Sequence, residues 1–517
     1  MIHTHTTSAV IYGSRFPFAT AASSIVATTS LIRHQLPNTS RLSDEQTNSS
    51  RRAYATMATT SNRPDMRAKN ANFAYFPLGY KEAAHQWWTS ISPAAAERNV
   101  LAHIPYLRDA LDTVTSATTT SSDPFGPRVW RSQMVQLPGK NRALNEFSVE
   151  RIGEPVEDNL VILHGYGAGL GFFYKNFEPL SRPEGWKIYA LDMLGMGNSS
   201  RPTFSVHAKD KDAKIAEAEA WFIDALEDWR KARNIDKFTL MGHSLGGYLS
   251  IAYALKYPGH LKKLILASPV GLPVDPYAVN EDLPEPAAST LENEFTQDQN
   301  TVVRDSHTKP TARAAASQKP PRRPTPGWFA WLWDANVSPF SIIRFTGPLG
   351  PRFVSGWTSR RFNHLPENES KSLHDYAFSI FRQRGSGEYA LPYLLAPGAF
   401  ARKPMVDRID GVGRQTISKP DGTTLKETGI PVVLMYGEND WMDVAGGLDA
   451  EERLKQARVR ALLANTDEEK RRENGSAKVI ITPKAGHHLY LDNAEHYNAA
   501  ILKEMAETRE HGRKGLA

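Results

Sequence analysis

A serine stands at the centre of the pentapeptide Gly-His-Ser-Leu-Gly at positions 242–246, and its setting is that of a catalytic nucleophile. An apolar run at 238–241 precedes the pentapeptide, and a helix-like run at 248–255 follows it. A strand, a sharp turn and a helix in this order hold a serine hydroxyl away from the sheet, and the glycines let the backbone pass close to its neighbours. An ordinary glycine-rich turn is the alternative. The context predicts that Ser244 is a nucleophile.

A serine hydroxyl is a weak nucleophile, so it needs a histidine base that a carboxylate orients. Both partners should follow the serine in the chain, the acid before the histidine. Asp440, just past an apolar run, is the predicted acid, and Asp443 is the reserve candidate. His487, after the last apolar run, is the predicted base, and His488 is its reserve. Either aspartate could instead cap a loop.

The negative charge that develops on the attacked carbonyl oxygen needs backbone N–H donors. One donor should be Leu245, which follows the nucleophile. The other should be Tyr166, in the glycine-rich loop 164–169 that follows an earlier apolar run. That loop lacks the Gly-Lys-Ser/Thr ending of a phosphate-binding loop, and its spacing does not fit G-x-G-x-x-G.

Alternating strand and helix patterns predict the scaffold for these residues. Short apolar strands are expected at 160–163, 187–191, 238–241, 261–267, 431–436 and 478–482, with helical patterns such as 210–234 between them. This rhythm predicts a mostly parallel sheet covered on both faces. Two further strands at 128–137 and 145–152 should form a hairpin at one edge. Helices are expected at 82–88 and 94–111, with the pair Trp87-Trp88 in the core.

The region 272–429 interrupts the alternation and predicts a cap. Its part 285–326 is rich in proline, alanine and charge and is expected to be disordered. Its part 327–395 is dense in aromatic residues and should cover the carboxyl ends of the strands. The catalytic core is therefore assigned to 80–271 and 430–510, with a helical cap inserted after the sixth strand.

The first 65 residues have the composition of a targeting leader. Met1–Ser43 contains no Asp or Glu, is rich in Ser, Thr and Ala, and includes Arg15, Arg33 and Arg41. The segment 51–55, Arg-Arg-Ala-Tyr-Ala, resembles a cleavage site of the mitochondrial matrix protease. A disordered tail is the alternative, and a mitochondrial transit peptide is the prediction.

Composition narrows the classes of function. The 517 residues contain no cysteine, which excludes disulfides, thiolate metal ligands and cysteine nucleophiles. A net charge of +6 and a pI near 9.1 are mildly basic, and no nucleic-acid motif accompanies the basic residues, so nucleic-acid binding is not expected. The sequence contains no run of eighteen apolar residues, so a transmembrane helix is not expected. The expected chemistry requires neither a metal nor a nucleotide cofactor.

With these residues in place, the chain resembles one α/β-hydrolase subfamily. That subfamily contains the lipase co-activator of the Chanarin–Dorfman type, the N-acyl-phosphatidylethanolamine lysophospholipases and the fungal mitochondrial cardiolipin-specific deacylases. The resemblance covers roughly 80–275 and 327–510, and its motifs are 164–171, 192–200, 338–340, 347–350 and 402–405. The triad alone indicates only the α/β-hydrolase fold, and the cap motifs narrow it to this branch.

The resemblance implies a lipid acyl ester as substrate. It also gives meaning to the H-x-x-x-x-D spacing from His487 to Asp492, which this subfamily links with acyl transfer to lysophospholipids. The alternative is that Asp492 caps a final helix that begins at about Ala494. Some members lack the serine and act only as co-activators. The presence of Ser244 disfavours a co-activator role for this chain.

The cap sequence predicts contact with an anionic membrane surface. No Asp or Glu occurs between Asp334 and Glu367. The residues expected to face the lipid are Trp328, Trp331, Trp333, Arg344, Arg352, Arg360 and Arg361. Tryptophans beside arginines suit an interfacial segment, although the tryptophans could instead pack inward on the core.

The sequence therefore predicts a serine-dependent phospholipid deacylase on the matrix side of the mitochondrial inner membrane, with cardiolipin as the favoured substrate. Two alternatives stay open. One is an acyl-CoA-dependent lysophosphatidic acid acyltransferase, and the other is a non-enzymatic lipase co-activator.

Overall fold

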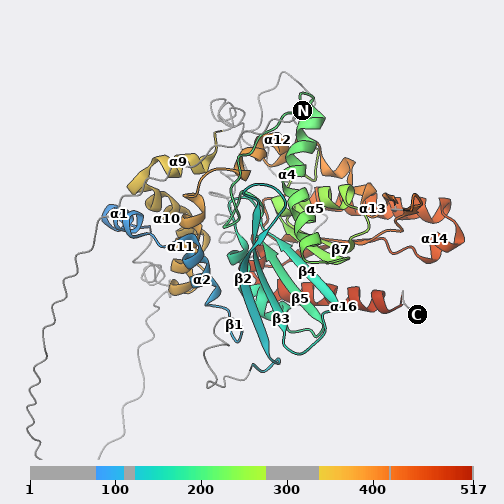
Figure 1. Ribbon diagram of the computed structural model, residues 1–517, viewed down its shortest axis with the longest axis horizontal. Coiled ribbons are helices and arrows are strands. Elements are labelled where there is room, and N and C mark those ends of the chain that lie inside the picture. The colour runs from blue at the N-terminus through green and yellow to red at the C-terminus, as the bar shows by residue number, and fades with distance from the viewer. Residues whose placement is uncertain (1–76, 110–122, 275–336, 419–420, 515–517) are drawn as a thin grey trace, which may run out of the picture. The chain divides into compact units, whose positions relative to one another are not determined.

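A nine-stranded sheet forms the centre of the computed structural model, which describes residues 77–109, 123–274, 337–418 and 421–514 (Figure 1). Its order is β1-β2-β3-β5-β4-β6-β7-β12-β13. The strands are β1 Arg108–Asp109, β2 Arg128–Gln136, β3 Ala143–Arg151, β4 Asp158–Leu163, β5 Trp186–Leu191, β6 Phe238–His243, β7 Leu261–Ala267, β12 Pro431–Gly437 and β13 Ser476–Thr482. Every pairing from β5 to β13 in this order is parallel, whereas β3 runs antiparallel to both of its neighbours, β2 and β5. The predicted mostly parallel sheet is confirmed.

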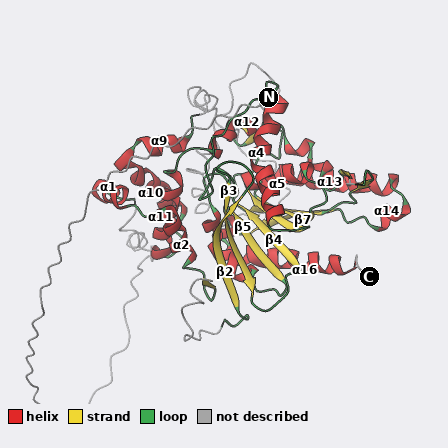
Figure 2. Cartoon of the chain, in the orientation of Figure 1, coloured by secondary structure: helices red, strands yellow, loops and turns green. Residues whose placement is uncertain are grey.

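Helices flank this sheet, red beside yellow in Figure 2. They are α3 Tyr174–Leu180, α4 Lys211–Ala232, α5 Leu245–Lys256, α13 Val444–Ala464, α14 Asp467–Arg471, α15 Leu489–Asp492 and α16 Ala494–Lys514. Helix α3 packs on α16, and α4 packs on α5. Every residue of β6 and β12 is buried, which explains why these central strands are continuous apolar runs in the sequence.

The cap follows β7, the sixth of the predicted strands, and is mostly helical. Its described elements are α9 Pro339–Phe345, the 3₁₀ turns Gly347–Leu349 (η4), Gly387–Ala390 (η5), Met405–Asp407 (η6) and Ile409–Gly411 (η7), α10 Gly350–Arg361, α11 Glu367–Phe381, α12 Leu391–Leu394, β8 Leu395–Ala396, β9 Phe400–Ala401, β10 Thr416–Ser418 and β11 Thr424–Lys426. The predicted α/β-hydrolase architecture with a helical cap is therefore observed. The predicted leader and the predicted disordered insertion lie outside the described residues.

The two helices before the sheet correct the sequence prediction. Helix α1, Tyr80–Thr89, packs against α10 and η4 of the cap, and α2, Pro93–Leu101, packs against α11. The expected helix 94–111 is wrong in its second half, because α2 ends before Pro105 and β1 follows. Trp87 and Trp88 were expected in the core, but the side chain of Trp88 is 81% exposed.

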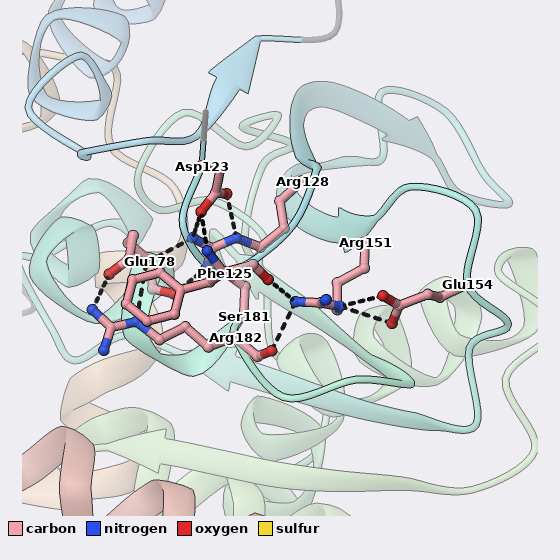
Figure 3. A network of polar contacts seen from close by, with 8 residues as sticks. All are labelled: Asp123, Phe125, Arg128, Arg151, Glu154, Glu178, Ser181 and Arg182. Atoms are coloured by element: carbon pink, nitrogen blue, oxygen red, sulfur yellow. Dashed lines mark hydrogen bonds and ion pairs between the residues drawn. The ribbon is translucent and has the colours of Figure 1, made fainter. Parts of the chain in front are cut away.

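Buried arginine contacts fix the antiparallel edge of the sheet (Figure 3). Arg128, at the start of β2, donates to Asp123 Oδ2 at 2.8 Å and to Glu178 Oε1 of α3 at 2.7 Å. Arg151, at the end of β3, donates to the carbonyl oxygen of Arg182, just after α3, at 2.9 Å. Because an unpaired buried charge is strongly destabilising, these contacts hold β2, β3 and α3 in one arrangement.

None of the described helices is both long and apolar enough to cross a bilayer.

Candidate active site

Ser244 lies on a strained turn between β6 and α5. Its backbone has φ 52° and ψ −116°, a conformation that residues other than glycine rarely adopt. A β-carbon at Gly242 would lie 2.3 Å from the carbonyl oxygen of Gly246, and one at Gly246 would lie 2.6 Å from that of His164. Both flanking glycines are therefore required by space. The Ser244 side chain is buried, and its Oγ has no hydrogen-bond partner among the described residues.

The predicted acid and base lie together beside this turn. His487 Nδ1 is 3.2 Å from Asp440 Oδ1, and both side chains are fully buried. An ionised carboxylate can only accept, so Nδ1 carries the hydrogen and Nε2 is left as the basic nitrogen. The ring of His243, the residue before Ser244, lies 4.8 Å from the His487 ring, centroid to centroid. The fold thus brings the predicted acid and base together and places the base beside the residue that precedes the predicted nucleophile.

The Asp440 carboxylate is held by further donors. Its Oδ2 accepts a hydrogen bond from the Ser268 hydroxyl, and its Oδ1 accepts one from the Met442 backbone N–H at 3.0 Å. Ser268 follows β7 and has φ 46°. Sequence reasoning missed Ser268, because a lone serine after a strand carries no pattern that points to an acid far along the chain.

The two reserve candidates have other surroundings. Asp443 Oδ1 accepts from the Ala445 N–H at 3.0 Å, so Asp443 is the N-cap of α13. His488 is buried beside His487, with 5.5 Å between their ring centroids. Burial, together with the charge of Arg361, holds the pKa of His488 well below its usual value. Neither reserve takes the place of Asp440 or His487 in the observed pair.

His243 holds the loop that carries His487. Its Nε2 donates to the carbonyl oxygen of His487 at 3.0 Å, because a carbonyl can only accept. Burial, and then the neighbouring His487, hold the pKa of His243 well below its usual value, so the ring is neutral. The sequence pattern assigned no role to His243. In the structure it links the nucleophile turn to the base.

The loop after β4 lies directly against Ser244. A β-carbon at Gly165 would lie 3.0 Å from Ser244 Cβ, and Tyr166 follows it in the same turn. Leu245 is the first residue of α5, where helical N–H groups have no partner within the helix. His164 fixes the loop, since its Nδ1 donates to Gly165 O at 2.7 Å and its Nε2 accepts from the next loop, at Met193 N–H. Both predicted oxyanion donors are therefore placed beside Ser244.

A buried pair of acids supports the oxyanion loop from behind. Asp192, fully buried after β5, accepts from the N–H of Leu170 at 2.7 Å and from Asn145 Nδ2 at 2.9 Å. The same Asn145 amide donates to Glu97 of α2 at 2.7 Å. Burial, and then the charge of Asp192, raise the pKa of Glu97 to about 8. Sequence reasoning missed this group, because Glu97 and Asn145 belong to segments with no shared motif.

Protonation of Glu97 should make folding stability depend on pH. Its pKa is about 8 in the folded chain against an ordinary value of 4.5, so the folded state binds the proton more tightly. This contribution to stability is complete below about pH 4.5 and is lost as the pH rises towards and past 8. Glu97→Gln, whose amide can donate to Ser132 Oγ and accept from Asn145, should flatten that loss. The urea midpoints of unfolding of both proteins at pH 6, 7, 8 and 9 measure this difference. The same dependence of the midpoint on pH in both proteins would contradict the prediction.

Asp492 and the predicted membrane arginines have unexpected contacts. Asp492 Oδ2 accepts from the Gly486 N–H at 3.0 Å, and its Oδ1 lies 3.6 Å from Arg361 Nη2. Asp492 is not the cap of α16, because Asn493 Oδ1 accepts from the His496 N–H at 3.2 Å. The expectation that Arg361 faces lipid is wrong, since its side chain is 4% exposed. The ion pair with a core carboxylate turns it inward.

The other residues predicted to contact lipid have different surroundings. Arg344 binds Glu388 at 2.6 Å and is half-buried, so it too is turned away from the surface. Arg352 donates to the Leu78 carbonyl at 2.5 Å and lies over the ring of Tyr80. Arg360 is exposed. Trp328, Trp331 and Trp333 lie outside the described residues.

Fold and site together define an α/β hydrolase, and sequence comparison agrees. The model of the alpha/beta hydrolase fold family matches residues 158–494, so the chain belongs to that family. It is 30% identical over 418 residues to a 1-acylglycerol-3-phosphate O-acyltransferase of Arabidopsis thaliana, covering 79% of this chain and 78% of the relative.

Two animal relatives define the branch. The 1-acylglycerol-3-phosphate O-acyltransferase ABHD5 of Mus musculus is 29% identical over 389 residues, which are 74% of this chain and 86% of the relative. The (lyso)-N-acylphosphatidylethanolamine lipase of Bos taurus is 27% identical over 382 residues, 73% of this chain and 86% of the relative. The predicted resemblance to the subfamily of the co-activator and the N-acyl-phosphatidylethanolamine lysophospholipases is confirmed. The resemblance to the fungal deacylases stays a prediction.

Proposed function

We propose that the protein is a serine-dependent phospholipid deacylase. One observation carries the proposal: the buried His487–Asp440 pair lies beside a serine whose φ of 52° is that of a nucleophile turn. The lipid substrate is supported by the names of the relatives, which act on glycerolipid or phosphatidylethanolamine acyl groups. Cardiolipin is the substrate that we favour within this class.

The reaction has two halves that use the same groups. Ser244 Oγ attacks the acyl carbonyl carbon while His487 Nε2 takes the hydroxyl proton, and the N–H groups of Tyr166 and Leu245 stabilise the oxyanion. The intermediate collapses, the bond to the lysophospholipid oxygen breaks, and His487 protonates that oxygen. Water, deprotonated by His487, then attacks the acyl-serine, releases the fatty acid and regenerates the Ser244 hydroxyl.

A second candidate is an acyl-CoA-dependent lysophosphatidic acid acyltransferase. Relatives that carry this name favour it, as does the spacing between His487 and Asp492. The same acyl-serine would form from acyl-CoA with coenzyme A as the leaving thiol, and the hydroxyl of the lysophospholipid would take the place of water. Hydrolysis and transfer then differ only in which acceptor attacks the acyl-serine.

Three assays on the purified chain separate the candidates. A deacylase releases fatty acid from cardiolipin vesicles without acyl-CoA and forms no diacyl product from labelled acyl-CoA and lysophosphatidic acid. An acyltransferase forms labelled phosphatidic acid from that mixture. A non-enzymatic co-activator shows neither reaction, and a fluorophosphonate probe does not label Ser244. Equal release from cardiolipin, phosphatidylethanolamine and phosphatidylcholine would remove the preference for cardiolipin.

We propose that the protein acts on the matrix side of the mitochondrial inner membrane. The first 43 residues, which contain arginines but no Asp or Glu, support this location. Import of the full chain into isolated mitochondria, with removal of a leader near residue 54, is the expected result. Lipid profiles of mitochondria with and without the active enzyme test the substrate in place, and an unchanged cardiolipin acyl pattern would favour a broader phospholipase.

For membrane contact we propose a surface that differs from the predicted one. It consists of exposed side chains on α1, α9, η4 and α10: Tyr80, Trp88, Ile342, Phe345, Leu349 and Phe353. Helix α1 packs on α10 and η4, and these elements lie together in Figure 1. The sequence from 335 to 366 adds no carboxylate to this surface, which suits a bilayer that contains anionic lipid.

Replacing both phenylalanines of this surface should weaken vesicle binding. Phe345 is 89% exposed, so Phe345→Ser/Phe353→Ser should leave the core intact. Burial of a phenylalanine contributes about 1.5–3 kcal/mol, so the loss of both should weaken the binding of the double variant to cardiolipin-containing vesicles about 10²- to 10⁴-fold in a flotation assay. Leu463→Ser, at an exposed position on α13, is the control. An equal loss in the control would contradict the assignment of this surface.

A further inference from the structure

The loop that carries the proposed base, residues 485–488 and hereafter the base loop, is held by backbone contacts on every side. The Asn439 N–H donates to the carbonyl of Ala485 at 2.9 Å, on the side of the acid. The carbonyl of His487 accepts from His243, on the side of the nucleophile. The N–H of Gly486 donates to Asp492 Oδ2 at 3.0 Å. Only the last of these contacts uses a charged group.

Asp492 also connects the base loop to the cap. Its second oxygen, Oδ1, lies 3.6 Å from Nη2 of Arg361, the last residue of α10. Arg361 is almost fully buried, and the exposed fraction of the Asp492 side chain is 15%. Nearby His364 is held neutral, because burial and then Arg361 lower its pKa to about 4. Arg361 therefore places a positive charge beside the partly buried carboxylate of Asp492.

The contacts of Asp492 bear on the meaning of the H-x-x-x-x-D spacing. The His487 nitrogen that faces a carboxylate, Nδ1, is engaged by Asp440. Asp492 instead contacts the peptide N–H of Gly486, the residue before His487. A peptide N–H has no role in moving the proton of the reaction. The spacing thus places a carboxylate where it can orient the backbone of the base.

We propose that Asp492 is a positioning residue that ties the base loop to Arg361 of the cap, and that it is not an acid–base group of its own. The proposal rests on the proposed function in that His487 is the base. Deacylation and acyl transfer both pass through His487, so loss of Asp492 should slow both reactions by the same factor. A role specific to acyl transfer would slow transfer alone.

The kinetic test compares five variants by the rate of fluorophosphonate labelling of Ser244 and by the turnover of a water-soluble ester. Asp492→Ala removes both contacts and should lower the labelling rate and kcat about 10- to 100-fold with little change in KM. Asp492→Asn keeps an acceptor for the Gly486 N–H, and Arg361→Met removes the ion pair, so each should lower the labelling rate and kcat severalfold. The double variant Asp492→Asn/Arg361→Met should lose no more activity than the more damaging of the two single variants. Asp443→Asn, an N-cap away from the base loop, is the matched control and should stay at the wild-type rate.

The pH profile and the product ratio separate a positioning role from a chemical one. The pKa seen in kcat/KM should be the same in the wild type and in Asp492→Asn, because Asp440 remains the partner of His487. Where acyl transfer is measurable, the ratio of transfer to hydrolysis should also be unchanged. A shifted profile, a selective loss of transfer, or wild-type kinetics in Asp492→Ala would each overturn the proposal.

Hydrogen exchange tests the contact apart from the chemistry. The Gly486 amide should exchange slowly in the wild type, faster in Arg361→Met, and fastest in Asp492→Ala. Equal exchange in all three would overturn the proposal even if Ser244 is fully active. If the fluorophosphonate does not label Ser244 of the wild type while the Gly486 amide still exchanges slowly, the proposed function fails but the contact with Asp492 holds.

Discussion

Ser244→Ala is expected to lower the turnover of any acyl ester by about 10⁵- to 10⁶-fold, because no acyl-enzyme forms without the attacking oxygen. Alanine keeps the β-carbon that the turn already accommodates at φ 52°, so the substitution adds no strain. It also removes a buried hydroxyl that has no partner among the described residues. The melting temperature should therefore be equal to that of the wild type or higher.

Two controls make this prediction sharp. Ser250→Ala removes another buried hydroxyl of α5, one that donates to the carbonyl of Gly246 at 2.6 Å, and should retain activity within a few-fold. Wild-type protein should be labelled by a fluorophosphonate at a single serine, and Ser244→Ala should not be labelled. Retained turnover in a folded Ser244→Ala protein would refute the mechanism.

Asp440→Asn is expected to lower kcat about 10³- to 10⁴-fold while leaving the fold in place. The Asn Nδ2 can take the position of Asp440 Oδ1, 3.2 Å from His487 Nδ1, and it would donate to that nitrogen. The imidazole would then carry its hydrogen on Nε2, and this tautomer cannot take the proton of Ser244. The structural damage is limited, because in this orientation the amide oxygen still accepts from the Ser268 hydroxyl and only the hydrogen bond from the Met442 N–H is lost.

The measurement is kcat with a soluble ester, together with a thermal melt of each protein. Asp443→Asn is again the matched control, since asparagine also serves as an N-cap. A loss in Asp443→Asn as large as that in Asp440→Asn would reverse the assignment of the acid. A loss in neither would remove the carboxylate from the mechanism.

Local patterns suffice for much of the site. The pentapeptide around Ser244 predicts its own turn, because a strand, two obligatory glycines and a helix are encoded within about twenty residues. Asp440 and His487 each follow an apolar strand in the expected order. Since parallel strands end at one edge of a sheet, their order alone brings these residues near the serine. The fold class was predictable for the same reason.

Contacts between distant segments could not be predicted from the sequence. Arg361 has the same local composition as a membrane-facing arginine, and only the position of α10 against Asp492 shows that it is buried. The residue type of Trp88 suggests burial, but α1 lies on the outside of the cap and leaves this residue exposed. Ser268 and Glu97 carry no motif, and each gains its role from a carboxylate in another segment, at Asp440 and at Asp192.

The sequence by itself predicted a nucleophile and the order of its partners, and it determined the sheet that positions them and the branch of the family. Those features arise from periodicity and from short motifs, which are local in the chain. The tertiary structure alone decided how the site is supported: by His243 on the carbonyl of His487, and by Asp492 between Gly486 and Arg361. Burial and pairing of charges depend on neighbours that only folding brings together.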